Sequence, residues 1–197
     1  VTDAFINCGS LWKIVVTSNN FPLLPAAFMQ SCTLMSEMTL TSNNIQTIDV
    51  DAFKGLVNLK FLFLVSNNIS CIKPGIFAYN PNLAFIDFTL NKINALHPSI
   101  FENLPKAYFI GFYKNLIEYI PNFNLSTTGI SAVSATVSLN FEFNPHSAVD
   151  PAFLTTAFQS RVATPPLSIN LKNYGTNACI SPQDLYATVS TSTWQTA

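Results

Sequence analysis

Asparagine recurs at one fixed interval along much of the 197-residue chain. Each step is 24 residues, and the positions are Asn19, Asn43, Asn67, Asn91 and Asn115. Phenylalanine keeps the same interval at Phe5, Phe53, Phe77 and Phe101, with Met29 in the remaining place. A constant period in this range predicts a solenoid, in which each coil buries its apolar side only against its neighbours.

The chain divides into blocks that begin at Leu11, Met35, Leu59, Leu83 and Ala107 and follow the pattern LxxLxLxxNxIxxIxxxxFxxLxx. Apolar residues at positions 4 and 6 predict a short strand with one inward face, and successive strands should lie parallel about 4.8 Å apart. The asparagine at position 9 should point inward and bond the turn backbone of its own and the next coil. The asparagines one place later should face solvent; these are Asn20, Asn44 and Asn68.

The pattern resembles the leucine-rich repeat family in its extracellular 24-residue class, as in Toll-type ectodomains and arthropod immune proteins. The resemblance covers residues 1–125. It implies an α/β fold, a leucine-rich repeat solenoid (horseshoe) with a parallel β-sheet on the concave face. The convex turns should be mostly irregular or short helices.

We predict a single domain over residues 1–197, which begins with the tail of a preceding repeat at 1–10 and regular repeats at 11–125. Degenerate repeats and a C-terminal cap should follow at 126–180, and a polar tail at 181–197. Residues 132–140 fit a sixth strand segment whose ladder residue, Asn140, comes one place late, and Phe153 fits its displaced ring. Because the chain opens in mid-repeat, we expect either a fragment of a longer chain or an N-terminal face that docks on something.

The four cysteines fall into two pairs. Cys8 and Cys32 share one repeat position, and stacked positions about 5 Å apart lie within disulfide reach. The sequence favours two buried thiols in a leucine column, with a disulfide as the alternative. Cys71 on an outer turn and Cys179 beyond the last clear strand are separated by several coils, too far to bridge, so they should be free or pair with another chain.

Composition narrows the function. The net charge is −1 and only 10% of residues are charged, with no basic stripe, so nucleic acid is not an expected partner. No apolar run approaches the roughly 18–20 residues of a membrane span. Two sequons, Asn68-Ile69-Ser70 and Asn124-Leu125-Ser126, predict glycosylation at Asn68 and Asn124. With the extracellular repeat type, they favour a secreted protein or an ectodomain fragment.

Aromatic residues occupy outward positions of the middle strands, where the coil itself does not need them. We predict a partner-binding surface made of Phe61, Phe63, Phe85, Asp87, Phe109 and Tyr113. Aromatic residues exposed together are typical of interfaces. Two alternatives are that the rings only stack on one another to stabilise the sheet, and that the chain's own tail covers them.

No constellation of nucleophile, base, carboxylate pair or phosphate loop is visible around His97, His146 or elsewhere, so we expect neither an enzyme nor a metal or cofactor site. The favoured interpretation is a non-catalytic extracellular module that binds protein, by resemblance in immune recognition or adhesion. The alternative is a self-associating structural protein of a matrix, fibre or coat. A carrier of apolar small molecules fits less well, because the face of a short solenoid is open.

Overall fold

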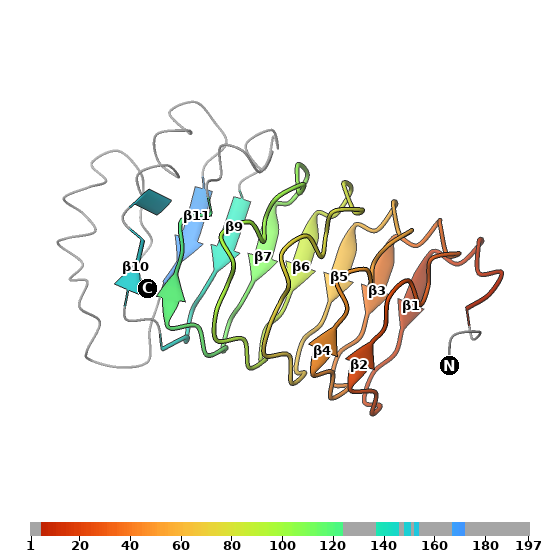
Figure 1. Ribbon diagram of the computed structural model, residues 1–197, viewed down its shortest axis with the longest axis horizontal. Helices are drawn as coiled ribbons and strands as arrows, with labels where there is room; N and C mark the ends of the chain where they lie inside the picture. Colours follow the sequence, from red (N-terminus) through yellow and green to blue (C-terminus); the bar gives the residue numbers. More distant parts are fainter. Residues whose placement is uncertain (1–4, 124–136, 146–147, 151, 154–166, 172–197) are drawn as a thin grey trace.

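Seven short parallel strands, one for each coil, form the main sheet of the computed structural model (Figure 1). The structure describes residues 5–123, 137–145, 148–150, 152–153 and 167–171. In sheet order the strands are β1 (Lys13–Val15), β3 (Glu37–Thr39), β5 (Phe61–Phe63), β6 (Phe85–Asp87), β7 (Phe109–Gly111), β9 (Val137–Asn140) and β11 (Leu167–Asn170). The predicted leucine-rich repeat solenoid with its parallel sheet is therefore confirmed.

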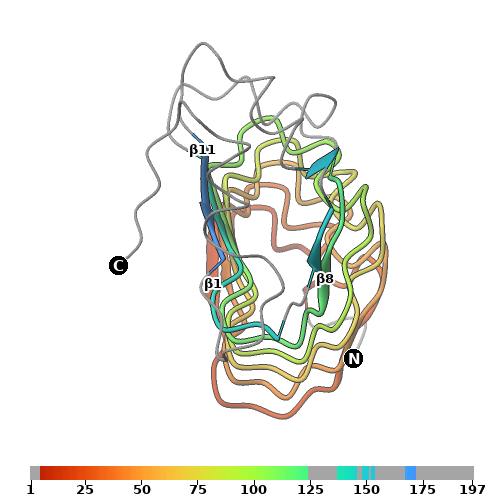
Figure 2. The same ribbon diagram turned by 90° about the vertical axis from the view of Figure 1, so that its left-hand side faces the viewer.

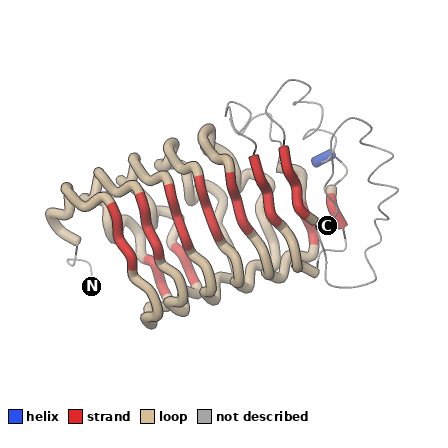
Figure 3. The backbone as a smooth tube through the Cα atoms, turned by 180° about the vertical axis from the view of Figure 1, so that it is seen from behind, coloured by secondary structure: helices blue, strands red, loops and turns tan. Residues whose placement is uncertain are grey.

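The opposite wall of the coils carries two small parallel sheets, which the sequence did not predict. One pairs β2 (Leu23–Leu24) with β4 (Thr47–Ile48), and the other pairs β8 (Tyr119–Ile120) with β10 (Ala148–Val149). Figure 2 looks along the solenoid and shows β8 across the interior from β1 and β11. Seen from behind in Figure 3, turns and loops join the two walls.

Inward side chains of the strands stack into columns that fill the space between the two walls. Position 4 supplies Met38, Leu62, Ile86, Ile110 and Leu139, and position 6 supplies Leu40, Leu64, Phe88, Phe112 and Phe141, all of them buried. The ring centroids of Phe112 lie 5.6 Å from Phe88 and 5.5 Å from Phe141. Beneath the outer wall, Phe53 stacks on Phe77 at 6.0 Å, and Met29 takes the ring place of its coil as predicted.

The asparagine ladder satisfies the backbone of the turns between strands. Asn67 accepts hydrogen bonds from the backbone N–H groups of Asn43 and Ile45 at 2.9 and 3.0 Å, and donates to the carbonyls of Leu40 and Leu64 at 2.9 and 3.1 Å. Asn43, Asn91 and Asn115 are also buried. Each buried ladder asparagine thus bonds the preceding coil, and the prediction that it bonds the next coil is wrong.

Two members of the ladder differ from prediction. Asn19 is exposed, because no strand and ladder turn precede it within the described residues, and its side chain donates only to Thr17 of its own turn. Asn140 is not a ladder residue, since it ends β9 on the outward side. Asn144 is buried in its place and accepts from the backbone N–H of Ile117 at 3.0 Å.

The reason for this shift is a longer coil. Ile110 pairs with Leu139, a step of 29 residues instead of 24. Five additional residues therefore separate these strands, and every later position moves with them. Phe153 is buried and its ring meets Phe123 edge-on with centroids 5.2 Å apart, which agrees with its prediction as the displaced ring.

Each coil bends sharply at the residue before the ladder asparagine. That residue has a positive φ between 53° and 59° in six coils, at Ser18, Ser42, Ser66, Leu90, Lys114 and Phe143. Left-handed backbone is uncommon for residues other than glycine and costs roughly 1–3 kcal/mol. The ladder bonds on the following residue hold the turn in this conformation.

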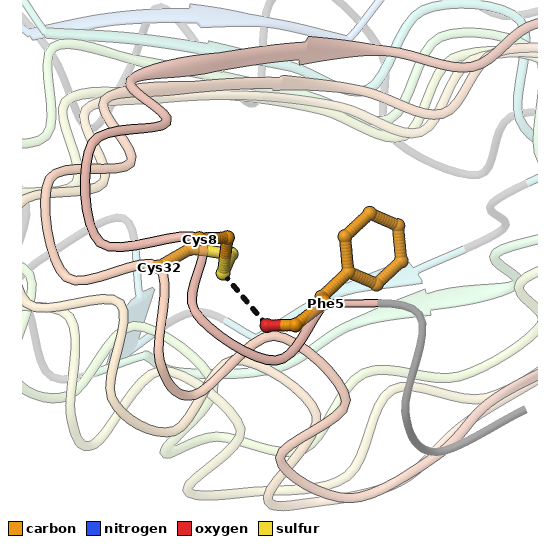
Figure 4. Close-up of a disulfide and its surroundings, with 3 residues drawn as sticks. All are labelled: Phe5, Cys8 and Cys32. Atoms are coloured by element: carbon orange, nitrogen blue, oxygen red, sulfur yellow. Dashed lines mark hydrogen bonds between the residues drawn. A yellow bond between two sulfur atoms is a disulfide. The ribbon is translucent and has the colours of Figure 1, made fainter.

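The structure corrects the prediction of buried thiols, because Cys8 and Cys32 form a disulfide whose Cα atoms are 4.7 Å apart (Figure 4). Parallel coils place the same repeat position of two turns within disulfide range. Cys8 Sγ also lies 3.0 Å from the Phe5 carbonyl oxygen. A disulfide sulfur carries no proton, so this is a close contact and not a hydrogen bond. Cys71 is free and exposed as expected, and Cys179 lies outside the described residues.

Candidate partner-binding surface

The outward side of the middle strands carries the residues predicted to bind a partner. Alternation within a strand turns Leu62, Ile86 and Ile110 inward and leaves their neighbours outward. The outward side chains of β5, β6 and β7 are half-buried, and none belongs to the core. They are Phe61, Phe63, Phe85, Asp87 and Phe109.

The rings on this face contact one another across strands. Phe85 stacks on Phe109 with centroids 4.4 Å apart and planes 10° apart. On its other side, Phe85 meets Phe63 at 5.1 Å, and Tyr108 adds an edge contact at 6.1 Å. We call Phe61, Phe63, Phe85, Tyr108 and Phe109 the aromatic strip. Ring stacking thus does stabilise the sheet, and it leaves the rings partly exposed.

Gly111 provides the space into which the ring of Phe109 leans. A Cβ atom on Gly111 would lie 2.8 Å from Phe109 Cε1 and 3.1 Å from its Cζ. The ring therefore lies along its own strand, over the glycine, and not upright from the sheet. Because Phe109 lies low, its face can stack on Phe85 in the neighbouring strand.

Asp87 lies between the rings, and one of its carboxylate oxygens is already hydrogen-bonded to the nearby backbone. Its Oδ1 accepts a hydrogen bond from the backbone N–H of Thr89 at 2.9 Å. Asn140 has the same place two strands away and caps the N–H of Glu142 at 2.9 Å in the same manner. One oxygen of Asp87 thus has a structural role, which was not predicted from the sequence.

The aromatic strip has polar borders at both ends. On one side, Lys13 and Glu37 form an ion pair at 2.8 Å across β1 and β3. On the other side, the register partners of Phe109 and Gly111 in β9 are Ser138 and Asn140. Within the described strands of the main sheet, the outward rings therefore occur in β5, β6 and β7, with Tyr108 just before β7. Val15 in β1 and Trp12 just before it are exposed apolar residues outside the strip.

Tyr113 lies apart from the aromatic strip, in the turn after β7. Its ring meets Phe143 edge-on at 5.0 Å, and Lys114 Nζ lies 5.4 Å from the Tyr113 ring centroid. Sequence reasoning placed Tyr113 in the binding surface but missed Lys114 and Phe143. The longer coil before β9 hides Phe143 from a search at the 24-residue interval.

The predicted glycosylation residue Asn68 belongs to a second, outer row of asparagines. Its Nδ2 donates to Asn44 Oδ1, and Asn44 Nδ2 donates to Asn20 Oδ1 at 3.0 Å. Asn20 and Asn44 are exposed as expected, whereas Asn68 is half-buried. Glycosylation at Asn68 stays a prediction, and Asn124 lies outside the described residues.

On the opposite wall, the exposed Tyr119 hydroxyl donates to Asp150 Oδ2 at 2.8 Å. This hydrogen bond to a carboxylate raises the pKa of the Tyr119 phenol, with smaller contributions from desolvation and charge repulsion.

Within the described ranges, no three His, Cys, Asp or Glu side chains gather as metal ligands would. The same part of the chain contains no helix with the length and apolar character needed to cross a membrane.

The repeat geometry agrees with the comparison to protein families. The leucine rich repeat model matches residues 9–69, which span the coils of β1 to β5. The match supports a leucine-rich repeat family. No curated protein matches the chain. The match covers the N-terminal coils, and the repeating strands and asparagine ladder continue beyond it to β9.

Proposed function

We propose that the chain is a non-catalytic module that binds a protein partner through the aromatic strip. Leucine-rich repeat domains generally mediate protein–protein interaction. The observation that carries the proposal is the stacked pair Phe85 and Phe109, which is outside the core and partly exposed.

Energetics support this use of the surface. The interior columns already close the coil, so outward rings are not required to form it. Apolar side chains grouped in water are costly, and burying each ring against a partner would contribute roughly 1.5–3 kcal/mol. Aromatic groups also lose little conformational entropy on binding, because they have only two side-chain torsions.

We further propose an extracellular location. The Cys8–Cys32 disulfide supports it, since such bonds persist in oxidising compartments and are rare in reducing ones. Surface polarity supplied by Ser, Thr and Asn, with few charges, is compatible with glycosylation at Asn68 or Asn124. A role in immune recognition or adhesion rests on the resemblance alone.

The test compares two triple variants. The first variant carries serine in place of Phe61, Phe85 and Phe109. The second carries serine in place of three exposed residues of the outer wall or its turns, Leu23, Val50 and Tyr79. Each immobilised protein captures material from the extracellular fluid of the source organism, and candidates are then titrated as purified proteins. We expect a partner whose affinity falls at least about a hundredfold with the first variant only. Equal affinity for both variants, with both folded by circular dichroism, would exclude the strip.

Self-association is the second candidate, favoured by exposed apolar residues of the first described coil. Val15 lies in β1 and is 55% exposed, and Trp12, just before β1, is 61% exposed. Exposed apolar side chains grouped on one surface are typical of contact sites between proteins. Light scattering over a dilution series tests this, and a constant monomer mass would reject it.

A further inference from the structure

Asp87 is the one charged side chain on the outward face of the described strands that has no ion-pair partner. The other two charges, on Lys13 and Glu37, neutralise each other at 2.8 Å. Asp87 Oδ1 accepts from Thr89, and Oδ2 makes no hydrogen bond within the described residues. One carboxylate oxygen is therefore open to a ligand.

Rings border this carboxylate on both neighbouring strands. Phe63 is the register partner of Asp87 in β5, and its ring contacts Phe85 at 5.1 Å. On the β7 side, Asp87 Oδ1 and Phe109 Cε1 both lie within 3.0 Å of the same point above Gly111. Asp87 is thus half-buried, with aromatic rings on both sides of its carboxylate.

An apolar partner alone would fit this place poorly. Covering the strip would remove water from the Asp87 carboxylate, and a buried carboxylate without a partner is strongly unfavourable. A cation offsets that loss, because a carboxylate attracts it and phenyl rings within about 6 Å add cation–π attraction. Arginine suits both at once, since its planar guanidinium stacks on rings and donates in a fork to carboxylates.

We propose that Asp87, Phe63, Phe85 and Phe109 form the seat of an arginine side chain contributed by the protein partner. This inference rests on the proposed function of the aromatic strip and names the partner group that it recognises. Gly111 is a positioning residue of the seat, because it lets the Phe109 ring lie beside the carboxylate.

The probe is N-acetyl-arginine amide, titrated into the isotope-labelled protein and followed by NMR. The neutral analogue N-acetyl-citrulline amide has nearly the same shape and serves as the ligand control. We expect saturable shifts at the amides of Phe63, Asp87 and Phe109, with arginine binding about tenfold more tightly than citrulline. Equal binding of the two, or no shift at these amides, would overturn the proposal.

The diagnostic variant is Asp87→Asn, which removes the charge and retains an Oδ1 for the Thr89 N–H. Asn140 already performs this capping in β9, so the fold should be unaffected. Arginine affinity should fall about tenfold in Asp87→Asn and stay unchanged in the charge control Glu102→Gln, an exposed residue of an outer turn. An unchanged affinity in Asp87→Asn would reject the seat.

Measurements with the captured partner separate this inference from the function itself. Loss of affinity in the triple Phe variant but not in Asp87→Asn would reject the arginine seat and leave the binding module standing. Loss in neither would reject both. Loss in both, with a partner whose affected contact maps to an arginine, is the result we expect.

Discussion

Phe109 and Phe112 belong to the same coil, three residues apart, but lie on opposite sides of its wall. Phe112 points inward and is fully buried between Phe88 and Phe141. Phe109 points outward, is partly exposed and stacks on Phe85. Both rings thus stack on aromatic neighbours in adjacent coils. Only their surroundings differ, and this separates a ring that builds the coil from one that the coil leaves partly exposed.

The same contrast holds for two other residue types. Asn67 is buried with its amide saturated by backbone groups, while Asn44 is exposed in the outer row. Cys32 is buried in a disulfide, while Cys71 is free on the outer wall. Inward and outward columns of one solenoid therefore provide matched controls for each other.

The largest difference is expected between the two phenylalanines. Phe112→Ala should lower the free energy of unfolding by about 3–5 kcal/mol, because it opens a cavity in a stacked column. Phe109→Ala should lower it by about 1–2 kcal/mol, because the ring is already partly exposed and its removal opens no cavity in the core. Urea unfolding measures both. Similar losses for the two variants would break the distinction between inner and outer rings.

The second largest difference in stability is expected between the paired and the free cysteines. Changing both Cys8 and Cys32 to Ser should destabilise the protein by about 2–4 kcal/mol, since the disulfide closes a loop of 24 residues. Cys71→Ser should stay within about 0.5 kcal/mol. Alkylation of the native protein followed by mass spectrometry should modify Cys71 while sparing Cys8 and Cys32. Labelling of Cys32 without reductant would contradict the disulfide.

A smaller difference in stability is expected between the inner and the outer asparagines. Asn67→Ala leaves buried backbone groups of two coils unpaired, which should cost about 1–3 kcal/mol. Asn44→Ala removes a solvent-exposed contact and should change stability by less than about 0.5 kcal/mol. Hydrogen exchange should locate the loss caused by Asn67→Ala at the backbone N–H of Ile45, which donates to Asn67 Oδ1. Equal effects of the two substitutions would argue against an inner ladder.

The outer wall supplies the smallest effect, through Tyr119 and Asp150. Because folding raises the pKa of this phenol, its contribution to stability is complete below the unfolded pKa of about 10. It disappears as pH rises through the higher folded pKa. Asp150→Asn should bring the Tyr119 pKa down toward the ordinary value. The titration of Tyr119 is the difference in phenolate absorbance between each protein and the same protein carrying Tyr119→Phe. An unchanged Tyr119 titration in Asp150→Asn would exclude this hydrogen bond as the cause of the raised pKa.

Prediction from sequence succeeded where one residue type recurred at one interval. Asn43, Asn67, Asn91 and Asn115 all took the buried place expected of them, and the alternation around Leu62 and Ile86 gave the strands. It failed at Asn140, because an unequal coil length shifts the register by an amount that only pairing with β7 reveals. It also failed at Cys8 and Cys32, where spacing allowed either thiols or a disulfide.

The candidate surface was predictable in most of its members but not in its geometry. Periodicity alone placed Phe61, Phe85 and Phe109 in register on the outward face. It could not show that Phe85 makes its second contact with Phe63, or that Gly111 lowers the Phe109 ring. Those features depend on side-chain torsions and on contacts between coils.

What the sequence determined by itself is the coil, because a fixed period of apolar and asparagine positions can bury its groups only by stacking equal turns. The tertiary structure decided which exposed groups act together. Asp87 joins the rings of Phe63 and Phe109 only when parallel strands set them side by side. Such contacts arise between residues about one repeat apart in the chain, and their geometry follows from packing rather than from the local sequence.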